Sequence, residues 1–318
     1  MKKILLTLLL SSTIWAVETI TPTLSIEVNG TVKDMVLSKD NLVVATDNGH
    51  IEVFNTKTLD KIEEIKLPNV KDFMGDEIPA RVLSSDKIDD KYLLLSDSGK
   101  NGYTNLFIYE NKNLTQIVSP KDKEAVIKAR FVDSSSVILG YLSNEVALLD
   151  LKTKKERYRV QLSESKFSDF ALNEDRTKVV FACESGVLNL VDVATGKVIK
   201  KLKGQNVDNV YKVDFKKDIV SGAGQDRRGS IYDTSTGRGS YIAGEFLIYA
   251  TALTPSTEKV AFSMDENNNI SIYNRLSKSK VALLKGQKST LSIIIFQDEN
   301  RLFSSSDDST IMIWDLKK

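Results

Sequence analysis

The sequence of 318 residues contains only one cysteine, Cys183, and one histidine, His50. A single cysteine cannot form an internal disulfide, and its place in the apolar run 179–183 predicts a thiol packed in the core. A single histidine excludes zinc and copper sites built on several histidines. The sequence also lacks a Cys-x-x-Cys-His motif, so neither c-type haem nor an iron–sulfur cluster has ligands here. We therefore expect no cofactor and no metal.

Signals for catalysis are similarly scarce. His50 follows the turn residues 47–49, which predicts a solvated turn histidine, and no Gly-x-Ser-x-Gly motif accompanies it. The acidic segment 265–269 offers oxygen ligands for calcium, but its spacing does not match an EF-hand, and an acidic turn is expected. A pair of carboxylates for glycoside hydrolysis remains open, because a fold can bring distant residues together. We predict a protein that is not an enzyme.

Positive charge is not in excess, and long apolar runs are absent after the N-terminus. The chain has 44 Lys and Arg against 43 Asp and Glu, which argues against nucleic acid as a partner. Lys2 and Lys3 precede the apolar run 4–10, which is shorter than the roughly 20 residues of a membrane span. This pattern predicts a Sec signal peptide, residues 1–16, cleaved after Ala16, with a membrane anchor as the alternative. No cysteine follows the run, which disfavours a lipoprotein. We expect a mature protein, residues 17–318, in a bacterial periplasm without membrane insertion.

A short pattern of two apolar or aromatic residues followed by Asp, Asn or Glu recurs along the chain. Its seven occurrences end at Asp315, Asn274, Asp233, Asp192, Asp150, Glu110 and Asn55. The first three intervals in this series are 41 residues each, and the next two are 42 and 40. A period of 40–45 residues is typical of propeller blades, each a four-stranded sheet. The sequence therefore predicts an all-β fold, a seven-bladed β-propeller that forms one domain over residues 17–318.

Two irregularities in the repeat carry further predictions. The last unit reaches Asp315 with only three strands, and the alternating segment 24–28 is expected to close the ring as its missing outer strand. The second unit is about 14 residues longer than the others, with the extra residues divided between 70–79 and 97–105. Long insertions in repeat proteins map to loops, often on the binding face.

The last repeat, residues 304–315, closely resembles the signature of WD40 repeats. In that family an Asp of the turn forms a hydrogen bond across the blade, and the matching positions here are Asp308 and Asp226. The Gly-His pair of the family is missing, and Gly204-Gln205 and Gly286-Gln287 stand in its place. The resemblance implies the propeller architecture for the whole mature chain. It leaves the usual His–Asp hydrogen bond in doubt and specifies no function.

A narrower resemblance concerns the client. The signal sequence, the length, the divergent WD-type repeats and the run 222–228 look like the NapL-type exported accessory proteins encoded with some periplasmic nitrate reductases. This resemblance implies a scaffold that binds another periplasmic protein, a nitrate reductase subunit among the candidates, and aids its maturation or activity. A scaffold for outer-membrane protein assembly and a propeller hydrolase or lyase acting on carbohydrate are the alternatives.

In a WD-type propeller, the turn between the second and third strands of each blade and the link to the next blade share one face. Aromatic residues and arginines gather in these segments, and both are enriched at protein interfaces. The residues that we expect on this face include Phe73, Met74, Arg81, Tyr103, Phe167, Arg227, Arg228, Phe246 and Tyr249. Arg227 and Arg228 lie in a tight turn where one guanidinium must point outward, suited to carboxylate contacts. We predict partner binding by Arg227, Arg228, Tyr103, Phe73, Arg81 and Tyr249.

Overall fold

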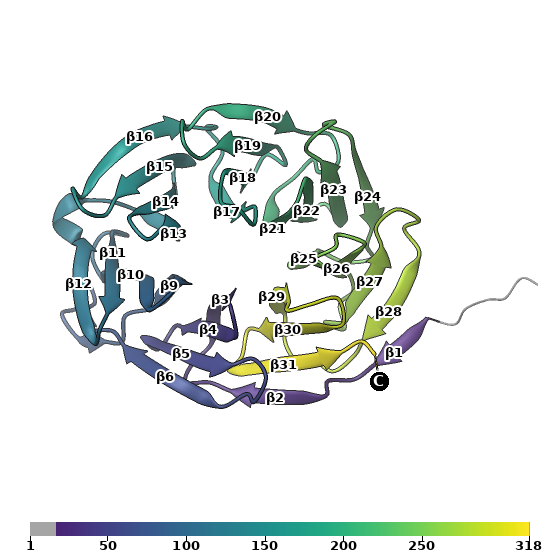
Figure 1. Cartoon of the computed structure of the whole chain (residues 1–318), viewed down its shortest axis with the longest axis horizontal. Helices are drawn as coiled ribbons and strands as arrows, with labels where there is room; N and C mark the ends of the chain where they lie inside the picture. Colours follow the sequence, from purple (N-terminus) through teal and green to yellow (C-terminus); the bar gives the residue numbers. More distant parts are fainter. Residues whose placement is uncertain (1–16, 318) are drawn as a thin grey trace, which may run out of the picture.

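The computed structural model describes residues 17–317, which form seven antiparallel sheets arranged as blades in a closed ring around a central channel (Figure 1). The predicted seven-bladed β-propeller is confirmed. The predicted signal peptide, residues 1–16, lies outside the described residues. No helix in the described part of the chain is long and apolar enough to span a membrane.

Each blade has four strands, numbered from the channel outward. Blade 1 contains β3 (Val32–Ser38), β4 (Asn41–Thr46), β5 (His50–Asn55) and β6 (Lys61–Lys66). Blade 2 contains β9 (Val82–Ile88), β10 (Lys91–Asp97), β11 (Thr104–Glu110) and β12 (Asn113–Val118). Blade 3 contains β13 (Val126–Asp133), β14 (Ser136–Tyr141), β15 (Glu145–Asp150) and β16 (Lys155–Gln161). A short 3-10 turn, η1 (Pro120–Asp122), connects blades 2 and 3.

The remaining blades repeat this plan. Blade 4 contains β17 (Phe167–Leu172), β18 (Lys178–Cys183), β19 (Leu188–Asp192) and β20 (Val198–Leu202). Blade 5 contains β21 (Val210–Lys216), β22 (Ile219–Gly224), β23 (Arg228–Asp233) and β24 (Gly239–Ala243). Blade 6 contains β25 (Thr251–Leu253), β26 (Lys259–Ser263), β27 (Ile270–Asn274) and β28 (Lys280–Leu284). Blade 7 contains β29 (Leu291–Phe296), β30 (Arg301–Ser306), β31 (Thr310–Asp315) and β2 (Leu24–Glu27).

The core consists of apolar layers between adjacent blades. Middle strands such as β18 are buried on both faces, which explains their near-continuous Val, Ile, Leu and Phe content. Outer strands such as β16 alternate between exposed and half-buried side chains, because one face meets solvent. Cys183 ends β18 and is fully buried, which confirms the predicted packed thiol.

The ring closes through the N-terminal segment, as predicted. β2 pairs antiparallel with β31, with Leu24 opposite Ile313 and Ile26 opposite Ile311. Ile26 is buried in the apolar layer between blades 7 and 1. A second pairing was not predicted: β1 (Glu18–Ile20) adds to blade 6 as a fifth strand, parallel to β28. The N-terminal segment therefore joins two neighbouring blades.

The two insertions of the second unit lie against each other. Residues 70–79 form a small hairpin, β7 (Val70–Lys71) and β8 (Glu77–Ile78), and residues 98–103 form the turn between β10 and β11. A Cβ atom at Gly99 would lie within van der Waals overlap of the Lys71 carbonyl oxygen, so only glycine permits this approach. The extra residues of blade 2 thus form one connected feature.

His50 is not the solvated turn histidine that the sequence predicted. It is buried at the start of β5, where its Nδ1 lies 2.6 Å from Glu64 Oε1. Its Nε2 lies 3.2 Å from Asn29 Nδ2, on the link that enters blade 1. The ring is enclosed by neighbouring segments, and its role is to connect β5, β6 and this link.

A glutamine takes the place of the missing family histidine in blade 7. Trp314 Nε1 donates to Ser304 Oγ (2.8 Å), and this hydroxyl donates to Gln287 Oε1 (2.9 Å). Gln287 Nε2 donates to Ser306 Oγ (2.7 Å), which in turn donates to Asp308 Oδ2 (2.8 Å). The amide both accepts and donates, so it completes a buried chain from the third strand to the turn Asp.

Replacing Gln287 with Leu is expected to destabilise the fold by about 1–3 kcal/mol, because the buried hydroxyls of Ser304 and Ser306 each lose a partner. Urea unfolding followed by Trp314 fluorescence measures the change. Gln205→Leu is the matched control in the second Gly-Gln pair. There the backbone N–H donates to Tyr232 and the carbonyl accepts from Arg228, so we expect a change below about 0.5 kcal/mol. Equal losses in the two variants would contradict the hydrogen-bonded chain.

Candidate functional site

The antiparallel order of the strands places two sets of connections on one face of the ring. These are the turns between second and third strands and the links between blades, and together we call them the linker face. Backbone hydrogen bonds join the two sets, for example from Gln225 to Asn209 (2.8 Å) and from Ile248 to Gly224 (3.2 Å). The predicted binding residues were chosen from these segments, so their placement decides which of them share a surface.

An aromatic cluster lies where blades 5 and 6 meet on the linker face. The rings of Tyr211 and Tyr249 stack with centroids 5.1 Å apart, and Phe246 tilts against Tyr249 at 6.5 Å. Tyr211 Oη donates to Gln225 Oε1 (2.9 Å), which fixes the cluster to the turn of blade 5. Arg227 is exposed in that turn, and its carbonyl accepts from Gly244 N–H at the start of the next link (2.7 Å). Sequence reasoning found Tyr249 and Phe246 but missed Tyr211, which begins an inner strand.

Arg228 differs from its neighbour. Its guanidinium lies over the Tyr241 ring at 4.6 Å and donates to the Gln205 carbonyl oxygen (3.2 Å). Arg228 therefore packs against the outer strand of its own blade, whereas Arg227 points to solvent with a positive φ of 63°. Of the pair, Arg227 is the residue that a partner can reach.

The remaining predicted residues lie at blade 2. Phe73 is almost fully exposed at the tip of the β7–β8 hairpin, beside Met74. Arg81 is exposed and lies 3.8 Å from Asp97. Tyr103 is half-buried, and its backbone closes the turn that carries Gly99. Blades 2 and 5 lie on different sides of the ring (Figure 1), so the predicted residues form two separate groups.

Phe167 belongs to neither group. It is buried in the layer between blades 3 and 4, where it contacts Phe170 and Phe181, so its expected place among exposed aromatics was wrong. Its position at the first residue of β17 did not reveal which way the ring points.

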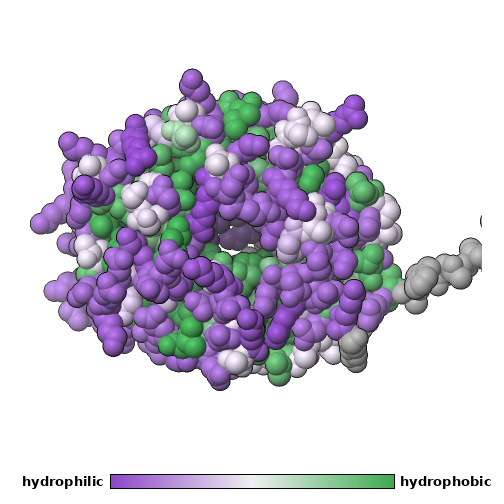
Figure 2. Space-filling model, in the orientation of Figure 1, coloured by the Kyte–Doolittle hydropathy of each residue, from purple (hydrophilic) through white to green (hydrophobic). Residues whose placement is uncertain are grey.

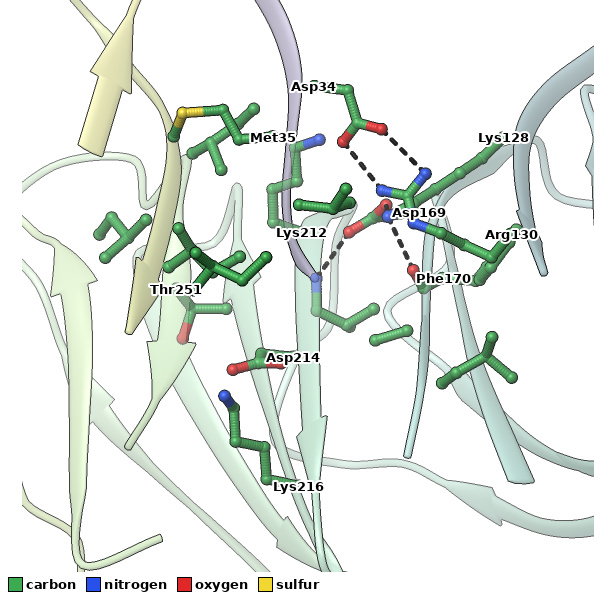
Figure 3. A pocket seen from close by; sticks show the side chains of 18 of the residues that line it. Asp34, Met35, Lys128, Arg130, Asp169, Phe170, Lys212, Asp214, Lys216 and Thr251 are labelled. Atoms are coloured by element: carbon green, nitrogen blue, oxygen red, sulfur yellow. Dashed lines mark hydrogen bonds and ion pairs between the residues drawn. The ribbon is translucent and has the colours of Figure 1, made fainter. Parts of the chain in front are cut away.

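The central channel contains a cavity of about 340 Å³ with charged walls (Figure 3). Four aspartates of the innermost strands each accept a backbone N–H from the following blade. These bonds run from Ser85 to Asp34 (2.8 Å), from Phe131 to Asp86 (2.9 Å), from Val213 to Asp169 (3.0 Å) and from Leu253 to Asp214 (2.7 Å). Because each bond crosses a blade boundary, the carboxylates connect blades around the channel.

Cations from other blades neutralise three of these carboxylates. The pairs are Arg130 with Asp34 (2.8 Å), Arg176 with Asp86 (2.9 Å) and Lys128 with Asp169 (2.6 Å). Burial by itself would raise the pKa of Asp169, but Lys128 and Lys212 outweigh it and hold the pKa below its ordinary value. Sequence reasoning missed this set, although Lys128 and Asp169 stand 41 residues apart, one repeat period, in otherwise apolar strands.

The rest of the channel wall is neutral overall and partly apolar. Its lining includes five acidic and five basic residues, namely Asp34, Asp86, Asp169, Glu174, Asp214, Lys128, Arg130, Arg176, Lys212 and Lys216. Leu37, Ile293 and Ile295 of β3 and β29 form the apolar side. Figure 2 shows this contrast at the channel mouth, with hydrophilic surface above the opening and hydrophobic surface below it. Among residues 17–317, no group of three or more His, Cys, Asp or Glu side chains is arranged to hold a metal.

The comparisons with known proteins agree with the architecture. No protein-family model matches the chain. Over 217 residues, 66% of the chain, the sequence is 23% identical to the guanine nucleotide-binding protein subunit beta of Saccharomyces cerevisiae. The matched segment spans 48% of that protein, about half of its length. This similarity and the seven-bladed ring together make the chain a WD40-like propeller.

Replacing Asp169 with Asn is expected to cost about 3–5 kcal/mol of stability, because the ammonium of Lys128 stays buried without its counter-charge. The double variant Lys128→Met/Asp169→Asn is expected to lose less than the single one. A double-mutant cycle by urea unfolding measures the coupling. Additive losses would show that the two side chains act independently.

The same pair predicts an acid dependence. Because the folded state lowers the pKa of Asp169, the pair stabilises the protein above the ordinary carboxyl pKa of about 3.9. This contribution is lost as the pH falls through the lower, folded-state value. Unfolding measured from about pH 5 to pH 2 should therefore show a smaller acid-induced loss in the double variant. An unchanged acid dependence would contradict this assignment.

Proposed function

We propose that this propeller is a binding scaffold for another protein, without catalytic chemistry of its own, and that its linker face is the contact surface. The observation that carries the proposal is the pairing of exposed Arg227 with the aromatic cluster of Tyr211, Phe246 and Tyr249. Arginine and aromatic side chains are over-represented among residues that dominate binding energy. The yeast relative supports this reading, because its name describes it as a subunit and therefore a component of an assembly.

The channel favours a scaffold over a carbohydrate hydrolase. Hydrolysis needs one carboxyl group with a raised pKa as general acid and a second carboxylate free to act as nucleophile or base. The pKa of Asp169 is lowered instead, and Asp34, Asp86 and Asp214 accept hydrogen bonds from neighbouring blades. Their arrangement suits the holding of blades better than proton transfer.

The finer part of the proposal concerns compartment and client. We propose export to the periplasm after cleavage at Ala16 and an accessory role for a respiratory nitrate reductase. This part rests on the basic and apolar N-terminal sequence and on the resemblance of residues 222–228 to accessory proteins of that system. The molybdenum, iron–sulfur and haem chemistry would then belong to the partner. A role in outer-membrane protein assembly is the competing client.

A crosslinking pull-down of the tagged mature protein from its native cells tests the scaffold. We expect Arg227→Glu to reduce recovery of the partner by at least about ten-fold, because the reversed charge faces the contact. Lys278→Glu is the matched control. It has the same charge reversal and the same left-handed backbone, but lies in an exposed turn of blade 6 on the opposite face.

The identity of the recovered protein tests the client. A molybdenum-containing nitrate reductase would support the accessory role, whereas outer-membrane assembly factors would replace it and leave the scaffold in place. Absence of any specific partner, or equal loss in the Lys278→Glu control, would overturn the proposed linker-face contact.

A further inference from the structure

We propose that the tip of the β7–β8 hairpin, Phe73 and Met74, inserts into an apolar pocket rimmed by basic side chains on a partner protein. The inference rests on the binding role proposed above and adds the chemistry of a second contact on the same face. It is independent of Arg227 and the aromatic cluster, which lie at blades 5 and 6.

The tip exposes two large apolar side chains next to each other. Phe73 is 92% exposed and Met74 is 72% exposed. Aromatic residues and methionine are enriched in protein interfaces, and their burial removes apolar surface from water. Two such neighbours at the end of a projecting hairpin have the shape of an anchor that enters a concave surface, because a flat surface would cover only one side of each.

Hydrogen bonds fix the conformation of the tip. Asp72 Oδ1 accepts from the backbone N–H groups of Met74 and Asp76, both at 2.9 Å. The backbone N–H of Asp72 donates to the Asp76 carbonyl oxygen (3.0 Å). Because the turn is already ordered in the free protein, binding sacrifices less conformational entropy than the ordering of a loose loop would.

The base of the hairpin is held by two glycine turns. Gly99 lies so close to Lys71 that no side chain fits, and a Cβ at Gly49 would lie 3.3 Å from the Ala80 carbonyl oxygen. Val70 packs against the apolar layer between blades 1 and 2. The tip therefore projects from a mount attached to both blades.

The charge around the tip indicates the partner. Asp72, Asp76 and Glu77 surround the two apolar side chains, and Lys71 is the one basic residue between positions 70 and 79. A pocket rimmed by Lys or Arg complements this charge, whereas an acidic rim would be repelled. The occupant we infer is thus a protein with a basic-rimmed apolar pocket, rather than a membrane or a second copy of this chain.

Site-specific photocrosslinking in the native cells tests the inference. The probe is benzoylphenylalanine at position 73, with the crosslinked peptides identified by mass spectrometry. We expect adducts on an apolar segment of another protein with Lys or Arg nearby. The probe at position 276, where Leu276 is 79% exposed on the opposite face, is the control and should give no such adduct.

The charge requirement has its own variant. Asp76→Lys/Glu77→Lys keeps Phe73 and Met74 in place and should lower the yield of the position-73 adduct by at least about ten-fold. The charge-neutral variant Phe73→Ser/Met74→Ser should lower the affinity for the identified partner to a similar degree. Trp314 fluorescence verifies that both variants remain folded.

A probe at position 246, in the aromatic cluster, separates this inference from the proposed function. Adducts at 246 with none at 73 would overturn the hairpin contact and leave the scaffold role. Adducts at neither position would overturn both. Adducts of position 73 with lipid, with another copy of this chain or with an acidic surface would overturn the inferred partner.

Discussion

The structure depends on closing the ring with a strand from the opposite end of the chain. Blade 7 has only three strands from its own repeat, so the edge of β31 would otherwise present unpaired backbone groups. β2 satisfies that edge, and Ile26 fills the apolar layer between blades 7 and 1. Seven separately weak sheets thereby become one closed structure in which each blade is covered on both faces.

Closure alone does not fix the blades relative to one another; the channel carboxylates contribute that constraint. Asp34, Asp86, Asp169 and Asp214 each cross a blade boundary, and Arg130 reaches from blade 3 to blade 1. Charged groups near the axis are thus used for structure, while the exposed aromatic and arginine side chains lie on the linker face. This division of polar and apolar residues between axis and face suits a scaffold, which needs a fixed surface more than a reactive cavity.

Much of this fold was predictable because its signals are local and periodic. The endings at intervals near 41 residues mark third strands, and the alternation in 24–28 identifies a strand with one buried face. Three features escaped prediction for physical reasons. The three residues of β1 carry no pattern, His50 is buried by Asn29 and Glu64 from other segments, and the orientation of Phe167 depends on packing between blades. Of the candidate site, the linker face followed from topology, but the difference between Arg227 and Arg228 required the position of Tyr241.

The most direct test of the account compares two substitutions on the closing strand, Ile26→Asp and Leu24→Asp, in the protein that begins at Val17. Ile26 is 8% exposed and Leu24 is 52% exposed, so the same new charge enters the core in one variant and solvent in the other. Trp314 is then the single tryptophan and is fully buried, which makes its fluorescence in urea a direct readout of unfolding. The account predicts a loss above about 3 kcal/mol for Ile26→Asp and below about 0.5 kcal/mol for Leu24→Asp. Equal, small losses would show that the ring does not depend on this strand.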